Sequence, residues 1–245
     1  MTIQAYLLMQ RCSDSELLEI RKDVPDFFNI SNIEGRVSLS KARNIILSSI
    51  DGGDLSGSVV AFPDDDCWYP HENLDAIIEE FSSSPELDLF YCRYSSSPAA
   101  LPKRFKRQLS PGVFSVVSYA SSNTMIMRGD LVRQAGLFDE TLGVGAKYNG
   151  GEDTDFALRI VALSKNVIFA DGAHIGHRNP DKTLRGVYYP GALLAIANSA
   201  RIVSGGWRVL AKKIAVGFWL VLKRELPLKK YLDVLGLGFR RFIAK

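Results

Sequence analysis

SVVAFPDDDCWYP, residues 58–70, contains the clearest structural signal in this chain. Its first residues are largely β-branched or aromatic, which is typical of a buried strand, and the strand is expected to end at Pro63. Asp64, Asp65 and Asp66 follow directly. Because ligands of open α/β sheets bind beyond the carboxyl ends of the strands, these acids occupy a position typical of a ligand site. A solvated acidic turn is the alternative interpretation, but three adjacent anions persist most easily where a divalent cation neutralises them.

The composition is that of an ordinary globular protein with an uneven charge distribution. The chain has 245 residues, of which 47% are hydrophobic and 23% are charged, enough for one large core. Its net charge is +3, yet residues 185–245 contain twelve Lys or Arg against two acids. That segment therefore carries +10 and leaves −7 for residues 1–184. A basic segment of this kind favours an anionic surface as its partner, and a nucleic acid is not expected.

Cysteine use and hydropathy indicate the cellular compartment. The three cysteines, Cys12, Cys67 and Cys92, are odd in number and lack metal-ligand spacing, which favours a reducing environment. The first residues do not have the pattern of a secretory signal. No apolar stretch approaches the roughly 20 residues that a spanning helix needs, and the longest, 214–222, is bracketed by basic residues. We therefore expect a protein that touches a membrane without crossing it.

Strand-like and helix-like segments alternate through residues 1–184, which predicts an α/β layered domain, and residues 185–245 are predicted to form a basic helical tail. Strands are expected at 3–9, 27–30, 58–62, 87–93, 113–127 and 167–170. Helices are expected at 14–22, from Ser38 or Ser40 to residue 50 before Gly52 and Gly53, at 73–81 and at 152–164. Residues 95–111 and 138–151 are expected to be loops.

A second group of acids lies in YNGGEDTDFALRI, residues 148–160, behind two glycines that permit unusual backbone dihedrals. Carboxylates in a first helical turn also complement the helix dipole, so capping is an alternative to chemistry. Helical spacing predicts that Glu152, Asp155 and Arg159 share one face, with Asp155 and Arg159 at i, i+4. It also predicts that Asp153 shares the apolar face with Phe156. An acid on the packing side of a helix needs a partner or a chemical role, which favours a function for Asp153.

His177 lies in the segment ADGAHIGHRN, after the last predicted strand. A lone histidine is more often structural than a ligand. Close to the Asp cluster, it would complete a mixed oxygen and nitrogen metal site or contact a phosphate. The sequence does not give that distance.

Taken together, these blocks resemble the family 2 glycosyltransferases, whose A-type fold binds nucleotide sugars. The resemblance rests on the order and spacing of GRVSLSKARN (35–44), VVAFPDDDCWYP (59–70), GLFDETLGVGAKYNGGEDTDFALRI (136–160) and the later His177, and it covers about residues 1–180. It implies a Rossmann-like nucleotide-diphospho-sugar transferase fold, with a mixed central sheet flanked by helices. Domain boundaries follow from it, with a catalytic domain at 1–184 and the basic tail at 185–245.

The resemblance implies a metal site formed by the acid triplet. Asp66 corresponds to a ligand of Mn²⁺ or Mg²⁺ that bridges the donor diphosphate, and His177 matches a histidine near that diphosphate, counted here with the metal ligands. Asp64 would lie against the ribose or the metal. Asp65 is expected to contribute to nucleotide-sugar binding.

The same resemblance implies the catalytic base and the nucleotide pocket. Asp153 matches the carboxylate that acts as general base, and Glu152 beside it is expected to contact the nucleotide sugar. Arg43 and Asn44 match a segment that lines the nucleotide pocket. One base and one metal site imply direct displacement with inversion.

Family members usually begin with an additional strand and helix, about 35 residues in a normal βα unit with its connections. The resemblance implies that this unit is missing before the strand at 3–9. Asp14 is the candidate to replace the acid of the usual turn.

The sequence thus predicts a metal-dependent inverting glycosyltransferase that moves a sugar from a nucleotide sugar, with a UDP-sugar as the expected donor, to a saccharide or lipid-linked acceptor. It would act in bacterial surface polysaccharide synthesis, in the cytoplasm and peripherally on the inner face of the cell membrane. One alternative is a catalytically impaired glycosyltransferase-like binding module, which the presence of Asp66 and Asp153 disfavours. Another is a metal-dependent nucleotidyltransferase or hydrolase, which the Glu-Asp helix start after a glycine loop disfavours.

Residues 207–224 are predicted to form a basic amphipathic helix. Its apolar face would contain Trp207, Leu210, Ile214, Phe218, Val221 and Leu222. Such a helix either lies in the interface of an anionic leaflet or packs its apolar face on the catalytic domain. The net charge of the tail favours the membrane.

Overall fold

The computed structural model describes residues 3–102, 107–108, 112–178 and 181–244. In chain order its elements are β1 (Ala5–Gln10), α1 (Asp14–Asp23), β2 (Phe28–Ile33), α2 (Leu39–Ser49), α3 (Gly52–Leu55), β3 (Val59–Ala61), β4 (Cys67–Trp68), α4 (His71–Ser83), β5 (Leu89–Ser95), β6 (Arg107–Gln108), α5 (Val113–Tyr119), β7 (Met125–Arg128), α6 (Gly129–Ala135), α7 (Glu152–Leu163), β8 (Val167–His177), the 3₁₀ turn η1 (Lys182–Leu184), α8 (Arg185–Ser199), η2 (Ala200–Ile202), α9 (Gly206–Leu222) and α10 (Leu228–Ala244).

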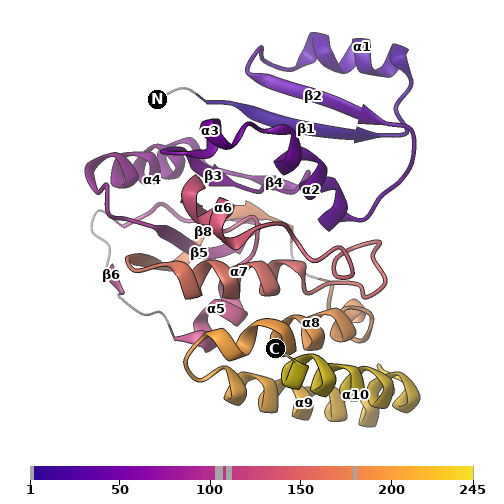
Figure 1. Ribbon diagram of the computed structural model, residues 1–245. Helices are drawn as coiled ribbons and strands as arrows, with labels where there is room; N and C mark the ends of the chain where they lie inside the picture. The colour runs from indigo at the N-terminus through magenta and orange to yellow at the C-terminus, as the bar shows by residue number, and fades with distance from the viewer. Residues whose placement is uncertain (1–2, 103–106, 109–111, 179–180, 245) are drawn as a thin grey trace.

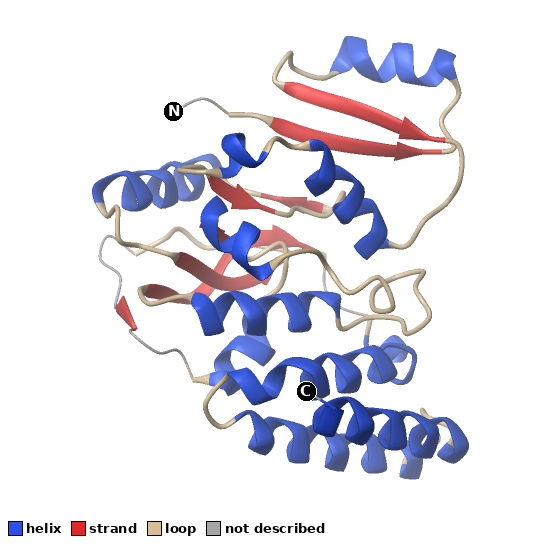
Figure 2. Ribbon diagram, viewed as in Figure 1, coloured by secondary structure: helices blue, strands red, loops and turns tan. Residues whose placement is uncertain are grey.

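The central sheet is mixed, as predicted, and has the strand order β3-β7-β5-β8-β4, with β6 also paired to β8. β5 and β8 are parallel, whereas β7 is antiparallel to both β3 and β5, and β4 is antiparallel to β8. β1 and β2 form a separate parallel pair. This pair and α1 lie at one end of the molecule, and α9 and α10 lie at the other, with the central sheet between them (Figures 1 and 2).

Alternating side chains of the central strands divide the core into two layers. In β5, Leu89 and Tyr91 belong to the larger cluster, which includes residues of α5, α7 and α8. Phe90 and Cys92 point to the other cluster, which contains Phe81 of α4. This is the period of two that a strand buried on both faces requires. Helices therefore cover both faces of the sheet, which confirms the predicted α/β class.

Residues 113–127 differ most from the sequence prediction of a strand. Residues 113–119 form helix α5, and only Met125–Arg128 form a strand. Val113 and Val116 are buried one helical turn apart, and Ala120 continues this side. The apolar side chains of the segment therefore lie on one side of a helix, which packs against the core. Here packing outweighs the local preference of valine for strands. Helix α6, which follows directly, was not predicted.

Two predicted boundaries also change. The strand expected at 167–170 continues to His177, because its distal half pairs with β4 and β5. Helix α2 begins after Ser38, whose side chain accepts a hydrogen bond from the Lys41 amide, but it ends at Ser49. Gly52 and Gly53 open the short helix α3 instead of stopping α2. Of the predicted loop 95–111, residues 103–106 and 109–111 lie outside the described part of the chain.

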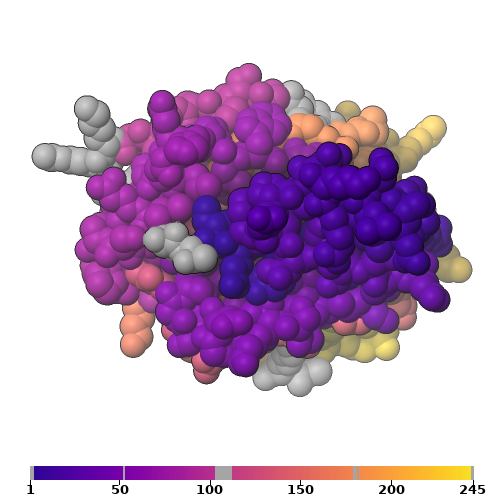
Figure 3. Space-filling model, turned by 90° about the horizontal axis from the view of Figure 1, so that it is seen from above, coloured from indigo at the N-terminus to yellow at the C-terminus, as the bar shows by residue number. Residues whose placement is uncertain are grey.

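The segment 185–244 is packed on the α/β body. Residues of α8, α9 and α10 belong to the larger core cluster, and Ser199 at the end of α8 donates a 2.7 Å hydrogen bond to Asp155 of α7. Seen from above, the face of the molecule is formed mainly by the N-terminal part of the chain, and the C-terminal helices reach only its margin (Figure 3). Within the described residues, no helix combines the length and the apolar character needed to cross a membrane.

The predicted apolar face of residues 207–224 is divided in the structure. Leu210 points into the core together with Leu220, so this side of α9 packs on the protein. Trp207, Phe218 and Leu222 are instead 63%, 54% and 66% exposed. One side of α9 therefore packs on the protein, as one of the two interpretations predicted, and another side remains apolar and exposed.

Candidate active site

Strand pairing brings the acid triplet to His177. After β3 the chain turns at Pro63 and returns as β4, which pairs with β8 so that Cys67 lies opposite His177. Asp66, the residue before Cys67, consequently lies beside the imidazole, with 3.1 Å between Asp66 Oδ1 and His177 Nε2. The other ring nitrogen, Nδ1, lies 2.7 Å from the Arg178 carbonyl oxygen. This second contact fixes the orientation of the ring.

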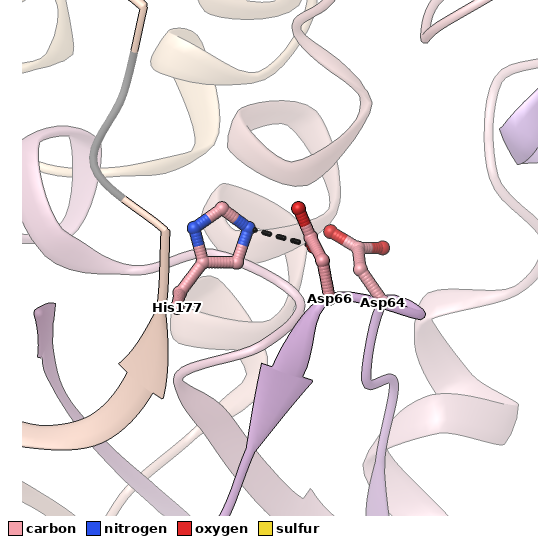
Figure 4. A group of neighbouring side chains, drawn as sticks. All are labelled: Asp64, Asp66 and His177. Atoms are coloured by element: carbon pink, nitrogen blue, oxygen red, sulfur yellow. Dashed lines mark ion pairs between the residues drawn. The ribbon is translucent and has the colours of Figure 1, made fainter. Parts of the chain in front are cut away.

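Asp64, Asp66 and His177 form a group suited to a divalent cation. One ligand atom from each lies within 4.8 Å of the others, and the three side chains converge in Figure 4. Asp66 Oδ2 is buried and has no hydrogen-bond partner among the described residues, although Arg178 Nε lies 2.6 Å away as an ion pair. Carboxylate oxygens with one imidazole fit Mn²⁺ or Mg²⁺ chemically. Asp65 is exposed and does not join the group.

Arg43 of α2 connects this group to the second set of acids. Its guanidinium donates to Asp64 Oδ1 at 2.8 Å and to Asp153 Oδ1 at 2.9 Å, although the two acids are far apart in sequence. A third bond goes to Ser122 Oγ at 2.8 Å. Burial alone would lower the pKa of Arg43, but the charges of Asp153 and Asp64 raise it overall. Arg43 is therefore a fixed cation that positions both carboxylates.

Asn123 binds the other carboxylate oxygen of Asp64, Oδ2. Its side chain accepts from the Asp64 amide at 2.8 Å and donates to Asp64 Oδ2 at 3.0 Å. The Tyr69 hydroxyl donates in turn to the Asn123 carbonyl at 2.9 Å. Burial raises the pKa of Asp64, and Arg43 opposes that shift. Sequence analysis missed Ser122 and Asn123, yet the polar run at 121–124 directly before a buried strand is a signal that could have found them.

The start of α7 has a different orientation from the predicted one. Glu152 and Asp155 are the buried acids, at 7% and 4% exposure, whereas the Asp153 side chain remains 26% exposed. Asp155 forms the expected i, i+4 ion pair with Arg159, at 3.0 Å. Asp153 therefore does not pack with the apolar face and instead stands beside Arg43 and Ser122, with its Oδ2 3.2 Å from Ser122 Oγ.

Glu152, the residue before Asp153, is buried. Burial, followed by the charge of Asp153, raises the pKa of Glu152 to about 7. The helix begins there because Gly151 adopts a left-handed conformation, φ +89°, and lies against the Gly191 backbone of α8. A Cβ at Gly151 would come within 2.3 Å of the Gly191 carbonyl oxygen, so this contact requires glycine.

Asn44 lies outside the acid network. Its side chain donates to the Phe138 carbonyl at 3.0 Å and to Glu140 at 3.1 Å, and it accepts from the Phe138 amide at 2.8 Å. These bonds attach α2 to the loop before α7. Asp14, the candidate substitute at the first turn, is exposed at the start of α1, whose cap is formed by Ser13 and Glu16.

Comparisons with known proteins give a match of fold alone. No protein-family model matches the chain, and no curated protein matches its sequence. The structure of S. aureus TarS residues 1–349 in complex with UDP superposes with a TM-score of 0.57 at 16% identity, covering 86% of this chain and 59% of that one. A second structure of S. aureus TarS gives 0.58 at 16% identity over 86% and 36% of the two chains.

GalNAc-T7 with UDP, GalNAc and Mn²⁺ superposes with a TM-score of 0.52 at 13% identity, covering 80% of this chain and 41% of that chain. The fold is that of the A-type glycosyltransferases. The chain spans less than two thirds of the length of each of these structures. We call Asp64, Asp66 and His177 the cation group. In the A-type fold of this chain, Arg43 joins this group to Asp153, because it pairs with both Asp64 and Asp153.

Proposed function

We propose that this protein is a metal-dependent inverting glycosyltransferase of family 2 that moves a sugar from a UDP-sugar to a saccharide or lipid-linked acceptor in bacterial surface polysaccharide synthesis. The observation that supports this most is the Arg43 bridge, which joins the cation group to Asp153 within an A-type fold. Solved structures with this fold contain UDP, and one contains Mn²⁺ as well.

Asp153 would act as the general base. It would accept the proton of the acceptor hydroxyl while that oxygen bonds to the anomeric carbon, and the bond from that carbon to the diphosphate oxygen breaks, which inverts the configuration and releases UDP. Asp153 Oδ1 is occupied by Arg43, whereas Oδ2 has, among the described residues, only the 3.2 Å contact with Ser122. Oδ2 is therefore the atom that we expect to take the proton.

Asp64, Asp66 and His177 would hold the cation, with Mn²⁺ favoured over Mg²⁺ because one ligand is a nitrogen. When bound, the ion would stabilise the negative charge that develops on the leaving diphosphate. Arg43 would line the donor pocket and hold Asp64 in place, and exposed Asp65 would contact the nucleotide sugar. Glu152 and Asn44 are proposed to contribute to that pocket indirectly. Glu152 would act through the neighbouring Asp153, and Asn44 would act by holding the loop before α7.

Calorimetry with UDP, with and without Mn²⁺, tests donor binding. We expect UDP to bind measurably only with the ion, and Asp66→Ala to remove this dependence. Glu79→Ala, an exposed acid on α4, is the control and should bind like the wild type. Equal UDP affinity with and without Mn²⁺ in the wild type would refute the metal-dependent donor site.

Turnover in Asp153→Asn tests the base. Its rate constant should fall by roughly 10²–10⁴, the usual loss for a missing general base, while UDP affinity stays within a few-fold. Retained turnover would exclude Asp153 as the base. A wild-type protein that binds UDP and Mn²⁺ but transfers no sugar would favour the catalytically impaired module instead.

We also propose that α9 and α10 attach the protein peripherally to the inner face of the cell membrane. Large apolar side chains are exposed on both helices, among them Phe218, Leu232 and Phe239, and the segment is strongly basic. The full chain should co-sediment with anionic vesicles at low salt, each nearby Lys or Arg contributing about 1 kcal/mol. Phe218→Ser with Phe239→Ser should weaken this binding, and wild-type protein that ignores anionic vesicles would exclude the attachment.

A further inference from the structure

A cavity of about 760 Å³ lies next to the cation group, between the end of β8 and helices α8 and α9. Tyr94 and His177 line it beside the cation group, and Val216 and Trp219 of α9 also form part of its wall. The volume is within the range of small-molecule sites. Arg43, Asp64 and Asp153 do not line it, so it is adjacent to the acid network and separate from it.

Tyr94 lies beside His177 in the wall of the cavity. Its ring centroid lies 4.8 Å from that of His177, and both side chains line the cavity. The cavity therefore adjoins the group of side chains proposed to hold the cation.

Two of the basic residues that line the cavity, Lys213 and Arg185, have no acidic partner among the described residues. Lys213 is half-buried, its Nζ lies 5.5 Å from the centroid of the Tyr189 ring, and burial lowers its pKa. Within the described residues, neither Lys213 nor Arg185 has a carboxylate at ion-pair distance. Arg178 is paired with Asp66, and the one acid in the wall, Asp181, accepts hydrogen bonds from Thr183. Two cations thus remain available to an anion.

The α9 wall of the cavity is apolar and continues onto the surface. Val216 and Trp219 line the cavity and are also 36% and 43% exposed. Phe218 and Leu222 continue this exposed apolar side by helical spacing. A molecule bound in the cavity would therefore contact cations inside it and the exposed apolar side of α9 at its opening.

We infer that this cavity binds the lipid part of the acceptor, a phosphate ester of a long apolar alcohol, with the phosphate at Lys213 and Arg185 and the hydrocarbon chain along the exposed side of α9. The hydroxyl that reacts belongs to a saccharide linked to that phosphate. The inference rests on the proposed function and specifies its acceptor. An anion would supply the negatively charged partner that half-buried Lys213 lacks among the described residues. A hydrocarbon chain covers the apolar side chains of α9, which a free saccharide would leave exposed.

Calorimetry with three probes tests the inference: octyl phosphate below its critical micelle concentration, inorganic phosphate, and octanol. Octyl phosphate should bind at least about tenfold more tightly than either of the others, because only it meets both the cations and the apolar wall. Equal binding of inorganic phosphate would reduce the site to a phosphate site and overturn the apolar part. Equal binding of octanol would overturn the anionic part.

Adjacent lysines on α9 provide matched variants. Lys213→Gln should weaken octyl phosphate binding about ten- to hundredfold, the loss expected for a charge-assisted contact, and leave octanol binding unchanged. Lys212→Gln should have no effect, because Lys212 is exposed and lies over Phe114, outside the cavity. Equal effects of the two variants would indicate general surface electrostatics and overturn the site. Arg185→Gln, at an exposed position, repeats the test if Lys213→Gln does not fold.

UDP with Mn²⁺ separates this inference from the proposed function. Saturating UDP and Mn²⁺ should not displace octyl phosphate, and displacement would show that the cavity is the donor diphosphate site. Wild-type protein that binds UDP and Mn²⁺ but not octyl phosphate would overturn the inference and leave the proposed donor site standing. Protein that binds octyl phosphate but not UDP would overturn the proposed donor site and leave the cavity as an alkyl phosphate site.

Discussion

Arg43 and Lys213 are both basic side chains withdrawn from solvent, yet their surroundings differ. Arg43 donates to two carboxylates and a hydroxyl, so its charge is balanced by residues of the same chain. Lys213 faces the Tyr189 ring and has no carboxylate partner in the described part of the protein. The first arrangement is complete as it stands and positions other groups. The second is incomplete, as expected where a ligand supplies the missing charge.

The largest effect is expected at Arg43. Arg43→Met would leave Asp64 and Asp153 without their shared cation, and the free energy of unfolding should fall by roughly 3–5 kcal/mol. Urea denaturation measures this change. Arg133→Met is the control, because within the described part of the chain Arg133 forms only an exposed 3.7 Å pair with Asp130, and its loss should cost at most about 1 kcal/mol. Equal losses in the two variants would remove the distinction between the buried network and a surface pair.

A smaller effect is expected at Glu152, which adds negative charge near Arg43. Its pKa rises from 4.5 in the unfolded chain to about 7 in the folded protein, so between these values the folded state binds more protons. The free energy of unfolding should therefore fall as pH rises from about 4.5 to 7, on the order of 1–3 kcal/mol, and level off above pH 7. Urea denaturation of the metal-free protein across this range measures the slope.

Glu152→Gln should remove that part of the slope, because the amide does not titrate. The variant should then be more stable than the wild type above pH 7 and similar to it near pH 4.5. An unchanged slope in Glu152→Gln would assign the pH dependence to other carboxylates.

The smallest effect is expected at Lys213. Lys213→Met removes a half-buried charge that has no acidic partner among the described residues, and it nearly keeps the side-chain length. The free energy of unfolding should therefore change by no more than about 1 kcal/mol in either direction. Thermal and urea denaturation measure it. A loss as large as that in Arg43→Met would mean that Lys213 has a structural partner and would undo the comparison.

Local patterns in the sequence were sufficient to place several parts of this protein. The strand before Pro63, the acids that follow it and the helix that begins at Glu152 were all recognisable, because hydrophobic periodicity and capping act over a few residues. The mixed α/β class followed from the alternation of such segments. The i, i+4 pair of Asp155 with Arg159 was predicted for the same reason.

Local preference was misleading where packing overruled it. Residues 113–119 look like a strand, yet they form α5 because Val113 and Val116 fit a helical face of the core. On α7, spacing alone did not show which side faces the protein, and Glu152 was buried instead of Asp153. Along α9 the apolar residues were visible in the sequence, but only the packing of Leu210 and Leu220 showed which of them are left for another partner.

Contacts between distant segments depended on the fold. His177 lies beside Asp66 because β4 and β8 pair with Cys67 opposite His177, and that register is not encoded near either residue. Arg43 reaches Asp64 and Asp153 from a third element for the same reason. Sequence patterns report the residue types and their local geometry. Distances between side chains that are far apart in the chain arise from sheet register and helix packing, which the folded protein sets cooperatively.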